Sequence, residues 1–104
     1  MRRRPNMADE MLERMRDGRA HDDAILMLTA SLEQVRAQLA GEAWQPDLFL
    51  AQAELLTDTA RCAAMALTLA STSATLIEAL AQGLGYDADG LLAGMAQVRP
   101  PFPR

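Results

Sequence analysis

The side chains with the greatest chemical potential are few and lie far apart along the chain. Cys62 is the only cysteine and His21 the only histidine. A catalytic thiol needs a neighbouring base, and only the fold could bring His21 close to Cys62. His21 precedes Asp22 and Asp23, a group that could bind a metal only with a distant further ligand. We therefore expect Cys62 to be a small buried residue, His21 to be solvated near a helix start, and no metal to be bound.

One pair of carboxylates has a spacing that could support metal chemistry. Glu54 and Asp58 lie one helical turn apart, but no Glu-x-x-His sequence supplies the histidine that di-metal helical sites use. Arg61 follows near the next turn, so an ion-paired surface is the simpler interpretation. The sequence also has no glycine-rich phosphate loop and no cysteine or histidine cluster. It therefore predicts a protein that is not an enzyme and that uses no cofactor.

The composition predicts an all-α protein. Of the 104 residues, 50% are hydrophobic and only 4% are aromatic. Most apolar residues are Ala, Leu and Met, which are strong helix formers, whereas residues that favour strands are scarce. We expect a small bundle of four to five helices in one domain over residues 8–98. A disordered basic lead-in (1–7) precedes it, and an extended proline-rich tail (99–104) follows it.

The charges give no sign of a general nucleic-acid surface. The net charge is -4, and the acidic residues are scattered along the chain. All ten basic residues are arginine, a bias typical of a GC-rich bacterial genome, and only Arg2, Arg3 and Arg4 form a cluster. No apolar stretch follows them, as a secretory signal would require, and a single cysteine agrees with a reducing compartment. We expect a cytoplasmic bacterial protein.

The strongest amphipathic pattern lies in a helix predicted from about residue 21 to residue 40. Its apolar residues recur at alternating spacings of three and four, which is typical of a coiled coil. We call them the heptad seam: Ile25, Leu28, Leu32, Val35 and Leu39. Shorter helices are predicted over 8–16 and 88–97, each next to glycine or aspartate residues that favour helix ends.

The segment from residue 47 to residue 82 predicts one long central helix. Pro46 and Asp47 form a helix start, and polar residues then recur every seven positions. Ser71, Thr72 and Ser73 mark where this helix could bend or break, since their hydroxyls compete for backbone hydrogen bonds. A short connection joins the segment to the preceding helix, so we expect a helical hairpin.

This segment has no charged residue between Arg61 and Glu78. We expect no membrane span, because the uncharged stretch is shorter and more polar than the roughly 20 apolar residues that a bilayer requires. Its apolar surface is wider than one neighbouring helix can cover, so another chain should cover part of it. The expected interface residues are Leu55, Cys62, Met65, Leu69 and Leu76.

The leading functional hypothesis is therefore a non-enzymatic protein-interaction module. Its simplest form is a homodimer that buries part of the long helix and also binds another protein. An accessory protein, an adaptor, or an antitoxin-like or immunity-like inhibitor would each fit this pattern.

The segment 80–93 contains two short helical patterns separated by glycine. Ala81, Gly85 and Leu91 stand where the helix-turn-helix of bacterial repressors has a small residue, a turn glycine and an apolar residue. The segment resembles that motif over about a fifth of the chain. The resemblance implies that residues 87–95 form a recognition helix that enters the major groove of DNA.

A DNA-binding regulator is therefore the alternative hypothesis. Its contacts to DNA, or to a protein partner, would come from the corner and from the basic lead-in: Tyr86, Asp87, Asp89, Arg2, Arg3 and Arg4. The segment departs from the motif, because its recognition helix carries acids and two glycines instead of the Arg, Asn or Gln that read bases.

Overall fold

The helix-forming composition produces an all-α bundle. The computed structural model describes residues 6–43, 47–50 and 52–99, with only the backbone described at 48 and 49, and these residues contain no strand. Its helices are α1 (Met7–Arg16), α2 (Arg19–Leu39), α3 (Asp47–Leu50), α4 (Ala53–Thr57), α5 (Thr59–Leu84) and α6 (Ala88–Met95). The predicted all-α bundle with one long central helix is confirmed. The basic lead-in 1–5 and the tail 100–104 lie outside the described residues.

Local signals set the limits of the first two helices. Asn6 caps α1 by accepting a hydrogen bond from the backbone N–H of Asp9 at 2.8 Å. Gly18 then adopts a left-handed conformation, with a φ of 86°, between α1 and α2. This conformation favours glycine because it strains residues that have a Cβ. The sharp turn lets α1 fold back against α2 and α5.

The long helix begins at Thr59 rather than at Asp47. Asp58 is in extended conformation and caps α5, since its carboxylate accepts the backbone N–H of Arg61 at 3.0 Å. The short helices α3 and α4 occupy the segment that the seven-residue repeat assigns to the first part of the long helix. In contrast, α5 is continuous through Ser71–Ser73, where the Thr75 hydroxyl donates to the Ser71 carbonyl at 2.9 Å within the helix.

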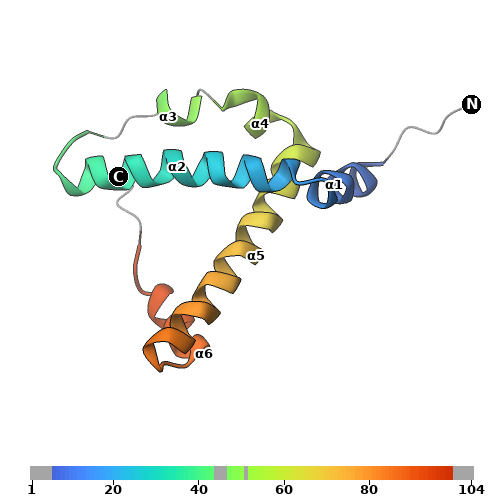
Figure 1. Ribbon diagram of the computed structural model, residues 1–104. Helices are drawn as coiled ribbons and strands as arrows, with labels where there is room; N and C mark the ends of the chain where they lie inside the picture. Colours follow the sequence, from blue (N-terminus) through green and yellow to red (C-terminus); the bar gives the residue numbers. More distant parts are fainter. Residues whose placement is uncertain (1–5, 44–46, 51, 100–104) are drawn as a thin grey trace, which may run out of the picture.

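The helices form an open arrangement rather than parallel layers. Figure 1 shows α3 and α4 running along one side of α2, while α5 crosses α2 and extends away from it on the other side. The α6 helix folds back at the far end of α5 and packs against it. As a result, the C-terminal half of α5 and the outer side of α2 have few neighbours.

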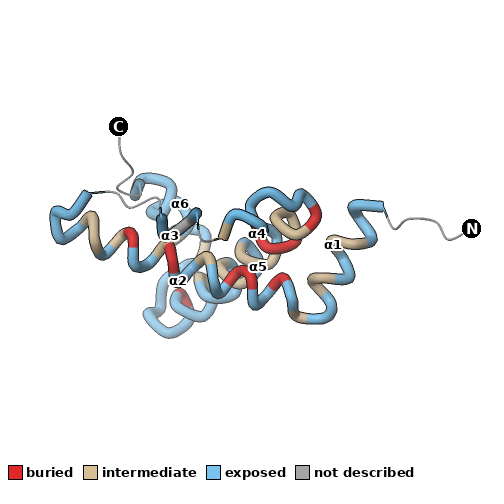
Figure 2. Tube along the Cα trace, turned by 90° about the horizontal axis from the view of Figure 1, so that it is seen from above, coloured by how far each residue is buried: buried red, intermediate tan, exposed pale blue. Residues whose placement is uncertain are grey.

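The core is small and lies where α2, α4 and α5 meet (Figure 2). Its centre consists of Ala24, Leu55 and Met65, with Met27, Cys62 and Leu69 packed against them. Leu55 and Met65 are the only large apolar side chains among the described residues that are buried, and the others are alanines of α2 and α5. Alanine lets two helix backbones approach closely but buries little apolar area.

The crossing should therefore tolerate no larger side chain. Ala64 of α5 is completely buried, and Ala64→Leu should lower the free energy of unfolding by about 2 kcal/mol through overpacking. Ala74→Leu is a matched control, because Ala74 is exposed on the same helix and should change stability little. Urea unfolding followed by circular dichroism measures both, and equal stability of the two variants would contradict the close crossing.

Candidate functional site

The residues considered for catalysis or metal binding do not come together. Cys62 is half-buried and packs against the core, whereas His21 is exposed on α2. Asp58 is used as the cap of α5 and Glu54 is exposed on α4. Among the described residues, no group of three or more His, Cys, Asp or Glu side chains could hold a metal ion.

The five expected interface residues have different positions. Leu55 and Met65 are buried against residues of their own chain, so they do not face another chain in this structure. Cys62 and Leu69 are half-buried at the edge of the same core. Leu76 is exposed. A surface that binds another chain is therefore formed by exposed apolar residues and not by Leu55 and Met65.

The first exposed apolar surface is the heptad seam of α2. Ile25, Leu28, Leu32 and Leu39 are all exposed, Leu39 to 76%, and Val35 is half-buried. The face of α2 that packs within the chain is a different one. Packing within the chain therefore covers the strongest amphipathic pattern in the sequence only in part.

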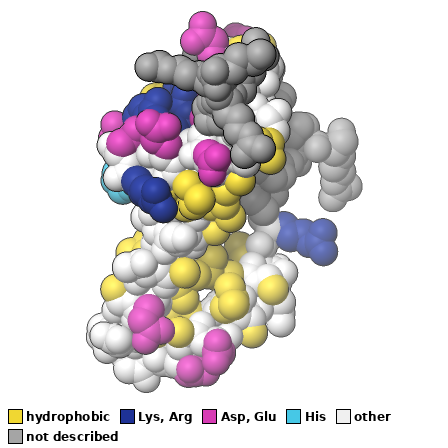
Figure 3. Space-filling view, turned by 90° about the vertical axis from the view of Figure 1, so that its right-hand side faces the viewer, with side chains coloured by type: hydrophobic (Ala, Val, Ile, Leu, Met, Phe, Trp, Pro, Cys, Tyr) yellow, Lys and Arg dark blue, Asp and Glu magenta, His cyan; other side chains and the backbone are white. Residues whose placement is uncertain are grey.

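The second exposed apolar surface lies on the far half of α5 and on α6, and we call it the distal face. Leu76, Leu80 and Leu84 recur every four residues along α5 and are exposed, as are Leu92 and Met95 of α6. Figure 3 shows hydrophobic side chains gathered on one side of the molecule, between a charged upper part and acidic side chains at the lower end. A shallow groove of about 500 Å³ on α6 adds to this face, and its lining residues are Gly90, Leu91, Gly94, Met95 and Val98.

The exposed area exceeds what a compact chain of this size presents. The accessible surface is 8029 Å², whereas a compact monomer of this mass exposes about 5,700 Å². The radius of gyration is 16.5 Å, compared with about 13 Å for a compact domain of similar length.

The corner between α5 and α6 has the order helix, glycine turn, helix. Gly85 has a φ of 72°, and the backbone N–H of Tyr86 donates to the Ala81 carbonyl at 2.8 Å. Asp87 caps α6 by accepting the backbone N–H of Gly90 at 3.3 Å. Ala81 is buried at this corner. Each of these residues therefore has a structural role in the turn between α5 and α6.

The surface of this corner is not basic. Tyr86 and Asp89 are exposed beside Asp87, and α6 contains no basic residue. Arg2, Arg3 and Arg4, the other residues proposed to contact DNA, lie outside the described residues. A phosphate backbone would therefore meet carboxylates at this helix start, which opposes binding.

The α5 helix is long and apolar enough to cross a membrane, judged by length and composition alone. It has 26 residues, and an 18-residue stretch of it has a mean hydropathy of 1.4 and is only 11% buried. The uncharged stretch in the sequence is short, but the helix continues beyond it to Leu84. Length therefore does not exclude a membrane span, whereas the polar residues Thr68, Ser71 and Glu78 still disfavour one.

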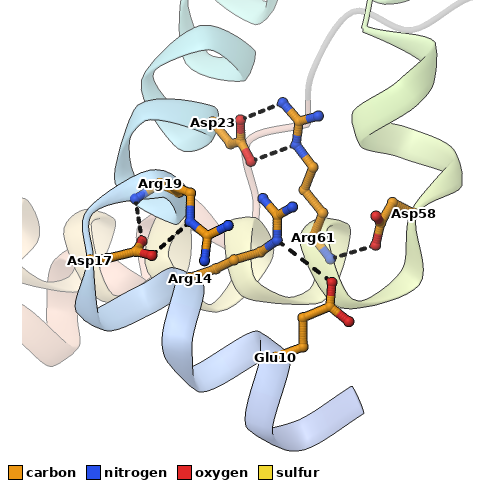
Figure 4. Close-up of polar contacts among 7 residues, drawn as sticks. All are labelled: Glu10, Arg14, Asp17, Arg19, Asp23, Asp58 and Arg61. Atoms are coloured by element: carbon orange, nitrogen blue, oxygen red, sulfur yellow. Dashed lines mark hydrogen bonds and ion pairs between the residues drawn. The ribbon is translucent and has the colours of Figure 1, made fainter. Parts of the chain in front are cut away.

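A cluster of charged side chains joins α1, α2 and α5 (Figure 4). Its centre is a bidentate ion pair, in which Arg61 of α5 donates from Nε and from one terminal nitrogen to the two carboxylate oxygens of Asp23, each at 2.9 Å. Asp23 is 7% exposed. Arg14 of α1 reaches toward this pair and lies 4.0 Å from Glu10.

The charges of Asp23 and Arg61 compensate each other, which is typical of a structural ion pair. The hydrogen bonds from Arg61 lower the pKa of Asp23, and its burial, which acts in the opposite direction, only partly offsets them. The same hydrogen bonds raise the pKa of Arg61. The pKa of the exposed Asp17 carboxyl is also lowered, mainly by the backbone N–H of Arg19. Each acid therefore stays ionised beside an arginine, and the pairs hold helices together.

Comparison with known proteins adds no assignment. No protein-family model matches the sequence, and neither a curated protein nor a solved structure is significantly similar to it. The inference of function therefore depends on the surfaces of this chain alone.

The Asp23–Arg61 pair predicts how stability depends on pH. The folded pKa of Asp23 lies below the ordinary value of 3.8, so its stabilisation is fully present above about pH 4 and is lost as the pH falls through the folded pKa. Asp23→Asn should lower the free energy of unfolding at pH 7 by about 2 kcal/mol and reduce its loss in acid. Urea unfolding at several pH values, at one protein concentration, measures both effects.

Glu33→Gln provides the control for the removal of a negative charge. Glu33 is exposed on the same helix, so this variant should follow the wild-type pH profile. If Asp23→Asn also followed that profile, the ion pair would not be the source of the acid dependence.

Proposed function

We propose that the protein is a non-catalytic protein-interaction module whose exposed apolar surfaces are covered by other protein chains, in the first place by a second copy. The observation that carries this proposal is the contrast between its core and its surface. Two large apolar side chains are buried among the described residues, whereas most leucines of α2, α5 and α6 are exposed.

Energetics favours covering these surfaces. Burying one leucine or methionine side chain contributes about 1.5–3 kcal/mol, so Leu55 and Met65 provide only a small part of the stabilisation that a domain needs. The exposed parts of the four exposed seam residues amount to about two whole side chains, so covering them would contribute about as much as burying Leu55 and Met65 does. Monomeric soluble proteins rarely expose apolar patches of this extent.

The positions of the two surfaces suggest what kind of module this is. The heptad seam lies on α2, and the distal face lies on the far half of α5 and on α6, so one partner on each could be held at the same time. An accessory subunit, an adaptor, or an inhibitor of the antitoxin or immunity type would use one surface for self-association and the other for its target. The arginine bias and the single cysteine favour the bacterial cytoplasm as its location.

Self-association is the direct test of this function. Light scattering and sedimentation equilibrium over a wide concentration range should give a mass above the 11.3 kDa of one chain, with dissociation at low concentration. Flotation with neutral lipid vesicles serves as the control for a membrane-bound α5, and the protein should stay in the soluble fraction. A mass of one chain at every concentration, or stable flotation with vesicles, would contradict the proposal.

The alternative is a small DNA-binding regulator, and the glycine corner between α5 and α6 is the observation that supports it. In this case α6 would enter the major groove, with Asp87 and Asp89 at its start. The acidic start and the lack of a basic residue in α6 make it the weaker proposal.

Titration of labelled duplex DNA with the protein separates the two functions. The interaction module should leave the fluorescence anisotropy of the DNA unchanged at low and at moderate salt. Binding that weakens steeply as salt increases would instead support the regulator, because phosphate contacts release counterions.

A further inference from the structure

The two sides of α2 differ in burial: one is buried within the chain and the other is exposed. The residues buried within the chain form one stripe, which contains Ala20, Asp23, Ala24, Ala30 and Gln34. The heptad seam lies roughly a third of a turn around the helix from that stripe and is left exposed. One face of α2 therefore holds the fold together, and the other presents two heptads of aliphatic residues to the outside.

We propose that the heptad seam binds the same seam of a second copy, with the two α2 helices antiparallel and a two-fold axis at the level of Ala30. This proposal rests on the function proposed above and specifies its self-association. The seam is self-complementary in this arrangement, because a two-fold axis makes each contact occur twice. Ile25 of one copy would face Val35 of the other, and Leu28 would face Leu32, so two leucine layers lie at the centre of the contact and a layer of β-branched residues lies at each end.

Charge selects the antiparallel orientation. Asp22 and Arg36 flank the seam on the same side, and both are exposed and form no ion pair with another described residue. In the antiparallel pair, Asp22 of each copy lies opposite Arg36 of the other, which gives two ion pairs across the interface. In a parallel pair, Arg36 would lie opposite Ser31, and neither charge would be compensated.

Thr29 lies on the same side of the seam as Asp22 and Arg36 and is compatible with this contact. Thr29 would meet Thr29 of the second copy near the axis, and its hydroxyl already donates to the Ile25 carbonyl at 2.8 Å within the helix. Its methyl group can therefore face the partner without leaving a polar group unsatisfied. The α2 helix has 21 residues, and the four seam residues that pair in this arrangement span about 15 Å of it.

A charge exchange tests the orientation. Asp22→Arg brings two positive charges together at each flanking pair, and Arg36→Asp brings two negative charges together there. Each variant alone should therefore self-associate about tenfold more weakly at low salt. In an equimolar mixture of the two variants, a mixed dimer can form. Each of its two flanking pairs then joins an arginine of one chain to an aspartate of the other, so both pairs are attractive. Native mass spectrometry should show the mixed dimer in excess over both homodimers, and the excess should diminish at high salt.

Glu33→Arg is the matched control, since it makes the same change of charge as Asp22→Arg at an exposed position of α2 outside the seam. It should associate like the wild type and show no preference for either variant. If the wild type associates but the mixture shows no excess of mixed dimer, the antiparallel seam is ruled out while self-association, and with it the proposed function, stands. A wild type that is monomeric throughout would instead remove both.

The seam itself is tested by Leu32→Glu with Leu26→Glu as its control. Both leucines are exposed on α2, but only Leu32 belongs to the seam, and Leu26 points to a different side of the helix. Leu32→Glu should weaken association at least tenfold while the helical content at high concentration in circular dichroism stays close to that of Leu26→Glu. Equal association of the two variants would place the contact on another face, such as the distal face.

Discussion

The close crossing of α2 and α5 is the constraint on which the rest of the structure depends. Alanines of both helices are buried, Met65 of α5 packs with Ala24 of α2, and the Asp23–Arg61 ion pair joins the two helices. Small side chains allow the backbones to come close, but each contributes little apolar area. The crossing therefore sets the geometry of the chain without supplying much of its stability, and the larger apolar side chains lie on surfaces that the crossing leaves open.

The ion pair also explains why α1 belongs to the same unit. Arg14 reaches toward Asp23 and Arg61 from α1, where Asp23 binds the Arg61 guanidinium group and Glu10 lies 4.0 Å from that of Arg14. The half-buried Arg61 is stabilised in this position by its bidentate hydrogen bonds to Asp23, and the same hydrogen bonds lower the pKa of Asp23. Removing one partner would leave a poorly solvated charge, so the cluster acts as one electrostatic unit.

The sequence predicted the helices better than their packing. Composition and periodicity were sufficient for the all-α class, for α2 and for the α5–α6 corner, because these depend on local propensity and on glycine and aspartate at helix ends. The start of the long helix was missed because the seven-residue polar repeat runs through Asp58 without interruption. The signal was present in Thr57-Asp58-Thr59, three residues that favour a helix cap, one of which caps α5.

The candidate interface was harder to predict, since periodicity identifies apolar faces but not their partners. Leu55 and Leu76 are separated by a multiple of seven residues and would share one face of a continuous helix, yet Leu55 is buried and Leu76 is exposed. The break at Asp58 turns α4 against α2 and α5 and brings Leu55 into the core, while Leu76 lies on the half of α5 that extends past α2. Only the tertiary arrangement separates the two residues.

The exposed apolar surface of a helix such as α5 can be covered either by a lipid bilayer or by another protein. A bilayer would surround α5 with lipid, and Glu78 would then lose its hydration and keep only the hydrogen bond from the Gln82 amide. A protein partner would cover only the leucine stripe and leave the polar side of the helix hydrated. The four-residue spacing of Leu76, Leu80 and Leu84 concentrates the apolar groups on one side, which is the distribution that a protein partner requires and a uniform lipid surface does not.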